Sequence, residues 1–381
     1  MQLSAISYRE YPQNPREWKL KKLSFGDVNL LVGRNATGKT RSLNIINALS
    51  NLLAGQARQP SNGEWTAEFV DQNDLYIYKL KIKEFSVAFE KLERIRNGKK
   101  QVLLTRTKSG AGKIYHERTK RLSDFQSPPD QIAAVARRDK IQHSYFIPLV
   151  NWGKNTFHFS FGRNLGYALV VESDSAQKSE FNPKDTSQVI DTFRRGEQEF
   201  GKKFINLILS DMARIDYRIQ NIGIDLPKGI KVSGPLPGKL RALFLKEEDL
   251  KCNTEQISIS AGMFAALSVI VHVNYRIMSM EPSCFIIDDI GEGLDYERSC
   301  SLIDLLIEKS KGSSFQLLLA TNDRFVMNAV PLDMWTVLKR DGSVVSGLNI
   351  RNAKSKFDAF RFTGLNNFDL FATDYLYTSK Q

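Results

Sequence analysis

The sequence predicts an α/β fold in which a mostly parallel sheet is flanked by helices and interrupted by an insert of antiparallel strands and helices. Over residues 28–53 an apolar strand, a glycine-rich turn and a helical pattern follow one another. Over residues 284–320 the chain again alternates strand, helix and strand. Such alternation favours a parallel sheet with helices on both faces. Between these regions, residues 64–115 alternate apolar and polar side chains between short turns, which indicates antiparallel strands.

The N-terminal region is expected to begin with strands. Residues 2–9 and 18–25 alternate in polarity and are separated by a turn rich in proline. The apolar run Val28–Val32 is typical of a buried strand. Residues 41–53 then carry apolar side chains at helical spacing, namely Leu43, Ile45, Ile46, Leu49, Leu52 and Leu53.

A phosphate-binding motif occupies the turn between this strand and this helix. The spacing G-x-x-x-x-G-K-[ST] is met by Gly33, Arg34, Asn35, Ala36, Thr37, Gly38, Lys39 and Thr40, and Arg41 follows. Glycines let the backbone N–H groups of such a loop point at phosphate oxygens, and the start of the next helix adds partial positive charge. Lys39 is placed to meet the β- and γ-phosphates, and the Thr40 hydroxyl to ligate Mg²⁺. The motif therefore predicts a nucleotide site.

Two carboxylates follow the apolar strand near residue 285. Asp288, at the end of such a strand, is suited to hold Mg²⁺, and Asp289 is suited to polarise an attacking water. Asn322 comes just after the next apolar strand. Because ligands bind parallel sheets at the carboxyl ends of the strands, we expect Gly33, Asp288 and Asn322 in one site.

The segment between the two α/β regions is expected to be an insert. After the predicted strands, residues 186–222 show a helical pattern, whereas 174–185 and 227–238 are rich in polar or turn-forming residues. We therefore predict three segments: an N-terminal part of the nucleotide-binding domain at 1–62, an inserted basic strand meander with a helical arm at 63–250, and a C-terminal part with an aromatic tail at 251–381.

Positive charge is concentrated in the insert. The formal net charge is +12, and the segment Lys79–Arg121 holds 14 Lys and Arg against 4 Glu. A surface this basic attracts polyanions such as nucleic acid. Charge alone supports non-specific binding at most, so a solvated arm is the alternative.

Composition indicates a folded cytoplasmic protein with no membrane partner. Ile257–Tyr275 lacks charged residues over 19 positions, but its serines, His272 and Asn274 favour a buried helix with a leading loop over a membrane span. Three cysteines without a C-x-x-C pair are typical of a reducing compartment and of neither a disulfide framework nor a zinc site.

The two ends of the chain, roughly residues 1–55 and 250–340, resemble an ABC-type ATPase of the SMC/RecF/OLD group, a P-loop NTPase fold. Asn35 gives the phosphate loop the form common in that group. Three further motifs follow in the expected order, namely Ile259-Ser260-Ala261-Gly262-Met263 for the signature loop, Ile286-Ile287-Asp288-Asp289-Ile290 for Walker B and Gly293-Leu294-Asp295 for the D-loop.

The resemblance implies a head-to-tail dimer, or a higher homo-oligomer, of ATPase domains. Two ATP molecules with Mg²⁺ would lie between the Lys39 loop of one subunit and the Ser260 and Gly262 loop of the other. Asp295 would also contact nucleotide, and Thr40 and Asp288 would hold the metal.

Two departures from the family pattern predict slow hydrolysis. The usual catalytic glutamate is Asp289 here, one methylene shorter, and the usual switch histidine is Asn322, which cannot carry a charge or a proton. Neither change affects the residues expected to bind ATP.

The compact insert is similar to that of small bacterial anti-phage defence ATPases, PtuA-like and AriA-like. This likeness implies a nucleotide-gated sensor or scaffold that controls a separate effector protein. A DNA-repair ATPase of RecF type and the energy-coupling subunit of a membrane transporter are the alternatives. The aromatic tail Phe357–Tyr377 is either ordinary core or an interface.

Overall fold

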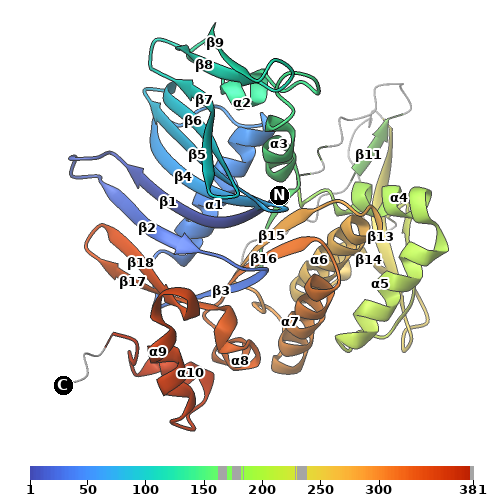
Figure 1. Ribbon diagram of the computed structural model, residues 1–381. Coiled ribbons are helices and arrows are strands. Elements are labelled where there is room, and N and C mark those ends of the chain that lie inside the picture. Colours follow the sequence, from blue (N-terminus) through green and yellow to red (C-terminus); the bar gives the residue numbers. More distant parts are fainter. Residues whose placement is uncertain (162–169, 174–181, 183, 228, 230–237, 378–381) are drawn as a thin grey trace. The chain divides into compact units, whose positions relative to one another are not determined.

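The computed structural model divides into two compact units, which are described separately (Figure 1). Unit 1 comprises Met1–Thr156 and Pro331–Gln381, and unit 2 comprises Phe157–Val330. The described residues are 1–161, 170–173, 182, 184–227, 229 and 238–377. The three segments predicted from the sequence, with boundaries near residues 62 and 250, were defined by the order of the motifs, and these boundaries stay predictions.

Unit 1 is built on a mixed sheet with the strand order β3-β17-β18-β2-β1-β4-β5-β6-β7-β8-β9. The strands are β1 (Gln2–Glu10), β2 (Trp18–Ser24), β3 (Val28–Val32), β4 (Asn62–Asp71), β5 (Asp74–Lys83), β6 (Ser86–Arg96), β7 (Lys99–Arg106), β8 (Ala111–His116), β9 (Arg121–Gln126), β17 (Trp335–Asp341) and β18 (Val344–Asn349). Only β3–β17 and β2–β18 pair in parallel among these described strands. The prediction of a mostly parallel sheet is therefore wrong for unit 1, because the antiparallel meander continues its sheet.

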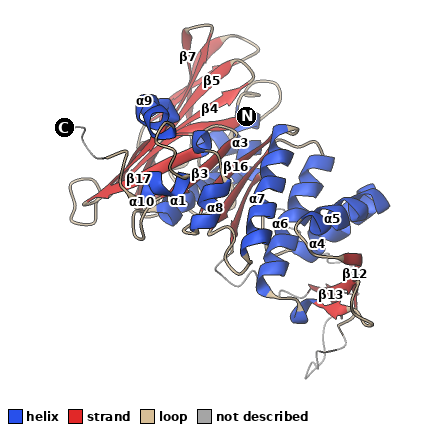
Figure 2. Cartoon of the chain, turned by 90° about the horizontal axis from the view of Figure 1, so that it is seen from below, coloured by secondary structure: helices blue, strands red, loops and turns tan. Residues whose placement is uncertain are grey.

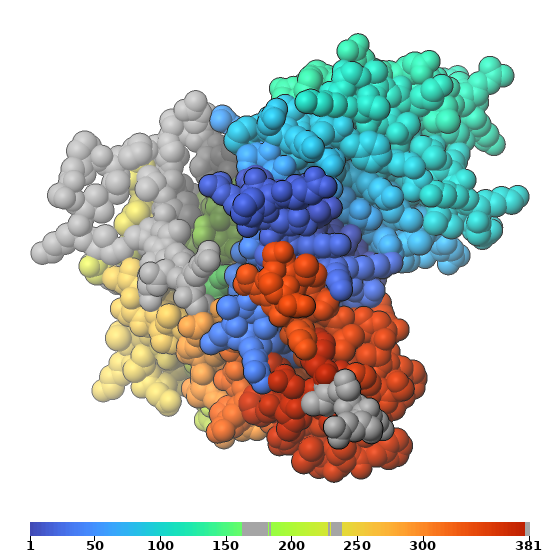
Figure 3. Space-filling view, turned by 90° about the vertical axis from the view of Figure 1, so that its left-hand side faces the viewer, coloured from blue at the N-terminus to red at the C-terminus, as the bar shows by residue number. Residues whose placement is uncertain are grey.

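The meander itself was predicted correctly and runs further than expected, to Gln126. Because apolar and polar residues alternate along each strand, one face of the meander is buried. In β4, Trp65, Ala67 and Phe69 are buried, and the residues between them are half-exposed. In the space-filling view, the β17–β18 region adjoins the N-terminal strands (Figure 3), as the pairing of β18 with β2 requires.

Helices α1 (Lys39–Ala54), α2 (Ala133–Ala136) and α3 (Phe146–Lys154) belong to unit 1. The Trp65 indole N–H donates to the Ile45 carbonyl of α1 at 3.3 Å, and Phe69 meets Trp152 of α3 with ring centroids 4.8 Å apart. A side chain at Gly153 would lie 2.8 Å from the Ser50 carbonyl oxygen, so glycine permits the close packing of α3 on α1. Helices α1 and α3 thus cover the buried face of the meander.

The C-terminal segment packs largely as core. It contains η2 (Leu332–Met334), α9 (Ile350–Arg361) and α10 (Asn367–Ala372). Phe357 and Phe360 are buried, which confirms the core interpretation for these two aromatics. Phe362, however, is 91% exposed.

Unit 2 contains a short sheet covered by helices. Strands β10 (Thr156–Ser160), β15 (Ser283–Asp288) and β16 (Phe315–Ala320) lie in that order, and β15 and β16 are parallel. The helices are α4 (Val189–Phe200), α5 (Lys202–Arg214), α6 (Ala261–Met278), α7 (Tyr296–Lys311) and α8 (Arg324–Ala329). A second sheet holds β11 (Val170–Ser173), β12 (Ile219–Asp225), β13 (Gly238–Glu247) and β14 (Thr254–Glu255), and η1 (Gln256–Ser258) leads into α6. Figure 2 shows α4 and α5 beside α6.

The helical segment predicted over 186–222 is confirmed for α4 and α5, but it is divided into two helices and ends before residue 219. Gly201 adopts φ 59 and ψ −142, a conformation open essentially to glycine, and separates α4 from α5. Residues 219–225 then form β12 and not the end of a helix. The loops predicted at 174–185 and 227–238 fall mostly outside the described residues.

The long charge-free segment forms a core helix, as predicted. Ala261–Met278 is long and apolar enough to span a membrane, but 83% of that helix is buried within the protein.

Candidate functional site

The phosphate motif forms a tight loop between β3 and α1. All five residues of β3 are buried, so the strand holds the start of the loop firmly. A side chain at Gly33 would lie 2.5 Å from the Thr37 hydroxyl oxygen and 3.2 Å from the Leu338 carbonyl oxygen. A larger residue at this position would have to displace the Thr37 side chain and press on the β17 backbone.

The loop then curls back before the helix begins. Ala36 and Gly38 have φ values of 63° and 102°, and the Thr37 hydroxyl donates to the Arg34 carbonyl at 2.8 Å. Gly38 is the N-cap of α1 and has no side chain with which to cap the first N–H groups of the helix. The N-terminus of a helix prepared in this way is suited to bind an anion.

Lys39 lies inside this loop. Its side chain is buried, with the residue only 6% exposed, and its Nζ donates to the Gly33 carbonyl at 2.7 Å and to the Arg34 carbonyl at 3.4 Å. The neighbouring Thr40 is half-buried. An ammonium held beside the backbone N–H groups of the loop provides the positive charge that a phosphate chain requires.

The two arginines predicted to bind nucleotide have acidic partners in unit 1. Arg34 forms an ion pair with Asp374 at 2.6 Å. Arg41 pairs with Glu10 and lies over the Trp18 ring at 4.3 Å. Both arginines are largely exposed, so these pairs are weak and can exchange for a ligand.

Unit 2 brings the predicted carboxylates and Asn322 to one edge of its sheet. The register aligns Ile287 with Leu319, which places Asp288 and Asp289 level with the end of β16. Asp288 is 2% exposed, and Asp289 has φ 54. Asn322 is exposed just beyond this edge. A buried carboxylate at the end of a parallel strand is a suitable oxygen ligand for Mg²⁺.

The predicted signature loop and D-loop also meet within unit 2. The Ser260 side chain caps α6 by accepting from the Met263 N–H at 3.4 Å. A side chain at Gly262 would lie 2.0 Å from the Gly293 carbonyl oxygen, so the two loops touch there.

Asp295 has a structural role that the sequence did not indicate. Its carboxylate accepts the backbone N–H of Arg298 at 2.9 Å and thereby caps α7. That hydrogen bond, together with the Arg298 guanidinium, lowers the pKa of Asp295. Its role in contacting nucleotide stays a prediction.

Sequence reasoning missed several neighbours of the phosphate loop. Arg340 of β17 donates to the Ala36 carbonyl at 3.2 Å. A side chain at Gly38 would lie 3.3 Å from both Trp18 and Val345. Arg340 and Val345 lie about 300 residues from the loop in the sequence, and Trp18 lies on a separate strand. No local spacing therefore predicts these contacts.

The predicted magnesium ligands belong to different units. Thr40 lies in unit 1 and Asp288 in unit 2, and each fits the metal by its oxygen chemistry. Their common site with Gly33 stays a prediction.

Comparisons with known proteins add little to these observations. No protein-family model and no curated protein matches the chain. Similar solved structures include an SMC head bound to the C-winged helix domain of ScpA, at 12% identity, 91% coverage of this chain, 97% of that chain and a TM-score of 0.49. An SMC head domain from Thermotoga maritima gives 13% identity, coverages of 92% and 99% and a TM-score of 0.43.

A third structure is an Smc head with an extended coiled coil bound to the C-terminal domain of ScpA derived from Pyrococcus furiosus. Its values are 13% identity, coverages of 94% and 99%, and a TM-score of 0.48. All three TM-scores lie below 0.5, a level that does not establish a shared fold. These likenesses therefore assign no activity to this chain, and its function is inferred from its own residues.

Proposed function

We propose that this chain is an ABC-type ATPase that binds ATP with Mg²⁺ through its phosphate loop. The observation that carries the proposal is the position of the buried Lys39 Nζ, 2.7 Å from the Gly33 carbonyl, beside the start of α1. A lysine is rarely buried unless its charge has partners, and here backbone carbonyls of the loop hold the ammonium in place. The ammonium and the helix start are two sources of positive charge in one small loop, and a polyphosphate chain complements both.

In this proposal the remaining residues act on the same nucleotide. Thr40 and Asp288 hold Mg²⁺, which neutralises charge on the phosphate oxygens when bound. Asp289 accepts a proton from the attacking water, and Asn322 donates a hydrogen bond to the phosphoryl group. Because Asp289 is short and Asn322 is uncharged, turnover is slow and the ATP-bound state is long-lived.

Charge supports self-association in a head-to-tail manner. Unit 1 holds 34 Lys and Arg against 19 Asp and Glu, a net charge of +15, whereas unit 2 holds 20 against 23, a net charge of −3. Residues 288–297 of unit 2 alone carry five carboxylates and no Lys or Arg. Tyr296 and Phe325, which are 56% and 39% exposed with ring centroids 4.8 Å apart, provide an apolar patch beside Asp295. An acidic, aromatic surface on one copy complements the basic phosphate-loop unit of another.

The cellular role we propose is a slow nucleotide-gated sensor or scaffold for a partner effector in anti-phage defence. Its support is the motif resemblance. Within the described part of the chain, no three His, Cys, Asp or Glu residues gather where they could hold a metal ion, so no separate metal-dependent effector site is found there.

The decisive experiment measures ATP binding and assembly. Lys39→Ala should weaken ATP binding by about 2–5 kcal/mol, because it removes a buried cation that meets phosphate. That loss corresponds to roughly 30-fold or more in Kd. Lys83→Ala, an exposed lysine of the same unit, serves as the control and should bind like the native protein. Calorimetry gives the affinities and light scattering the mass with and without ATP; equal binding by the Lys39→Ala variant would refute the proposal.

Nucleic-acid binding is a second candidate, supported by four exposed cations at hairpin tips. Lys99, Arg118, Lys120 and Arg121 make no ion pair with any described residue. Arg106, by contrast, is fully buried and cannot reach a nucleic acid, although it lies within the basic segment Lys79–Arg121.

Charge reversal at these four residues, which lie at two hairpin tips, tests the second candidate. If they meet phosphates, duplex affinity falls and the slope of its logarithm against salt becomes shallower by up to about 3–4. Reversal at Lys19, Lys21, Lys22 and Lys83 provides a variant of equal net charge. The same loss in both variants would reduce the effect to overall charge.

A further inference from the structure

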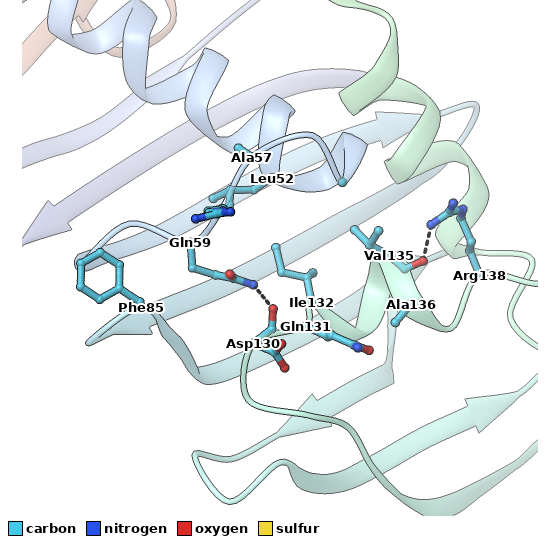
Figure 4. Close-up of a pocket in the computed structure, with 12 residues that line it drawn as sticks. Leu52, Ala57, Gln59, Phe85, Asp130, Gln131, Ile132, Val135, Ala136 and Arg138 are labelled. Carbon is cyan, nitrogen blue, oxygen red and sulfur yellow. Dashed lines mark hydrogen bonds between the residues drawn. The ribbon is translucent and has the colours of Figure 1, made fainter. Parts of the chain in front are cut away.

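A cavity of about 880 Å³ lies in unit 1 at the end of α1 opposite to the phosphate loop. It is bounded by the segment after α1, the β5–β6 turn and the loop that contains α2 (Figure 4). Its labelled residues extend in a row from Phe85 past Ile132 to Arg138, and we call the space that they line the groove.

The groove has an apolar floor. Leu52 and Ile132 are buried beneath it, and Val135 is half-buried. A side chain at Gly55, the C-cap of α1, would lie 3.2 Å from Val135, so glycine lets α2 approach the end of α1. Apolar groups in a groove of this size can receive one or two side chains of a ligand.

Phe85 forms one end of the groove in an unfavourable conformation. It lies in a two-residue turn in which Lys83 pairs with Ser86, and Glu84 and Phe85 have φ values of 52° and 59°. Asn-Gly is the usual occupant of such a turn, and a bulky residue at positive φ is an outlier. Phe85 is nevertheless 65% exposed. An exposed aromatic held at a conformational cost indicates a binding role.

The rim of the groove is cationic. Arg58 and Arg138 line it, are exposed and have no acidic partner among the residues that the structure describes. Arg138 donates to the Val135 carbonyl at 2.5 Å, which leaves its guanidinium at the rim. Asp130 is the one carboxylate among the described lining residues, so the rim has a surplus of positive charge.

A buried ion pair fixes the wall of the groove. Glu90 accepts the N–H groups of Ala133 and Ala134 at 2.8 and 2.9 Å, which anchors the start of α2. Arg106 donates to the carbonyls of Pro128 and Gln131 at 2.7 and 2.5 Å. Such contacts hold the loop in one shape before any ligand arrives, which lowers the entropic cost of binding.

We infer that this groove binds an extended acidic peptide segment of a partner protein through one or two apolar side chains. The apolar floor and Phe85 receive the anchor side chains, while Arg58 and Arg138 pair with flanking carboxylates. The row of lining residues from Phe85 to Arg138 fits an extended chain better than a compact metabolite. The inference is independent of the proposed ATPase activity, because the groove and the phosphate loop lie at opposite ends of α1.

Three labelled hexapeptides of matched design test the inference by fluorescence anisotropy. The first has a central Leu-Phe pair between two pairs of glutamates, the second replaces Leu-Phe by Gly-Gly, and the third replaces the glutamates by lysines. We expect only the first to bind measurably. Phe85→Ala should weaken it by roughly 10-fold or more, and the Arg58→Glu, Arg138→Glu double variant by more than that.

Two control variants separate the groove from general charge and stability. Arg137→Glu changes an exposed arginine outside the lining, and Leu122→Ala removes an exposed apolar side chain from another hairpin; both should bind within about twofold of the native protein. A Lys39→Ala variant should bind the peptide normally even if it loses ATP. Equal binding of the Gly-Gly peptide, equal losses in Arg137→Glu, or binding of a cyclic dinucleotide in place of the peptide would overturn the inference.

Discussion

The two units differ in charge, in strand direction and in the chemistry that each contributes. Unit 1 is strongly basic, is largely antiparallel and holds the phosphate loop. Unit 2 is slightly acidic, pairs β15 with β16 in parallel and holds the carboxylates Asp288 and Asp289. The residues proposed to bind phosphate therefore lie in unit 1, and the carboxylates proposed to hold the metal and to polarise water lie in unit 2. The division suggests that nucleotide affinity can be changed in one unit and hydrolysis in the other.

Each unit also has its own cluster of polar residues in its interior. In unit 1, Glu90 and Arg106 are both fully buried, and burial raises the pKa of Glu90. In unit 2, Lys309 lies 2.8 Å from Asp211 and 2.9 Å from the Asn274 amide oxygen, which joins α5, α6 and α7. Variants that break one cluster at a time test whether the units are stable independently.

The largest expected effect is the loss of Arg106. Arg106→Met leaves Glu90 buried without its cation and should destabilise unit 1 by about 3–5 kcal/mol. Lys309→Met should affect unit 2 by a smaller amount, because Lys309 is partly exposed. Hydrogen exchange read peptide by peptide assigns each loss to its unit. Lys108→Met, at an exposed lysine of unit 1, is the control, and equal loss of protection in both units after Arg106→Met would show that they unfold together.

A second effect concerns pH and unit 2. His272 is buried, its Nδ1 lies 2.8 Å from the Ser268 carbonyl, and burial lowers its pKa to about 4. The unfolded chain, with a pKa of about 6.5, therefore binds a proton more readily, and stability is lost as pH falls from about 6.5 towards 4. The full loss is about 3 kcal/mol.

His272→Gln should flatten this part of the pH profile. Urea unfolding at pH 7 and pH 5 measures the difference, and the variant should lose less stability between the two than the native protein. His116→Gln, at a half-exposed histidine of unit 1, provides the comparison. An unchanged slope in the His272→Gln variant would show that the imidazole accepts its proton without unfolding.

The smallest of these effects is on turnover. Asp289→Glu with Asn322→His restores the longer carboxylate and a group that can carry charge, and misplacement on the order of 1 Å costs about 100-fold in rate. We expect kcat to rise by roughly 10- to 100-fold with little change in ATP affinity, since neither substitution touches the phosphate loop or Asp288, which are proposed to bind ATP and Mg²⁺. Steady-state phosphate release measures the rate. Native turnover of tens per second, or a double variant that is no faster, would contradict the prediction.

Local pattern predicted the elements around the candidate site but not their neighbours. The strands at Val28–Val32 and near Asp288, and the helices that follow them, are apolar in a period that short windows reveal. The break at Gly201 was missed because a glycine within a helical pattern is often tolerated. The ion pair of Arg34 with Asp374 depends on how distant segments fold together, which no spacing records.

The contribution of both chain ends to unit 1 has a consequence for biosynthesis. Leu30 of β3 aligns with Trp335 of β17, and Lys19 of β2 with Val344 of β18. A ribosome adding about 5–20 residues per second needs roughly 15–60 s to pass from the first of these strands to its partner. During that interval the strand before the phosphate loop lacks its β17 neighbour, and open strand edges attract other chains. Nascent chains are thus expected to gain nucleotide affinity late in translation, and fragments that stop before β17 should depend on chaperones to remain soluble.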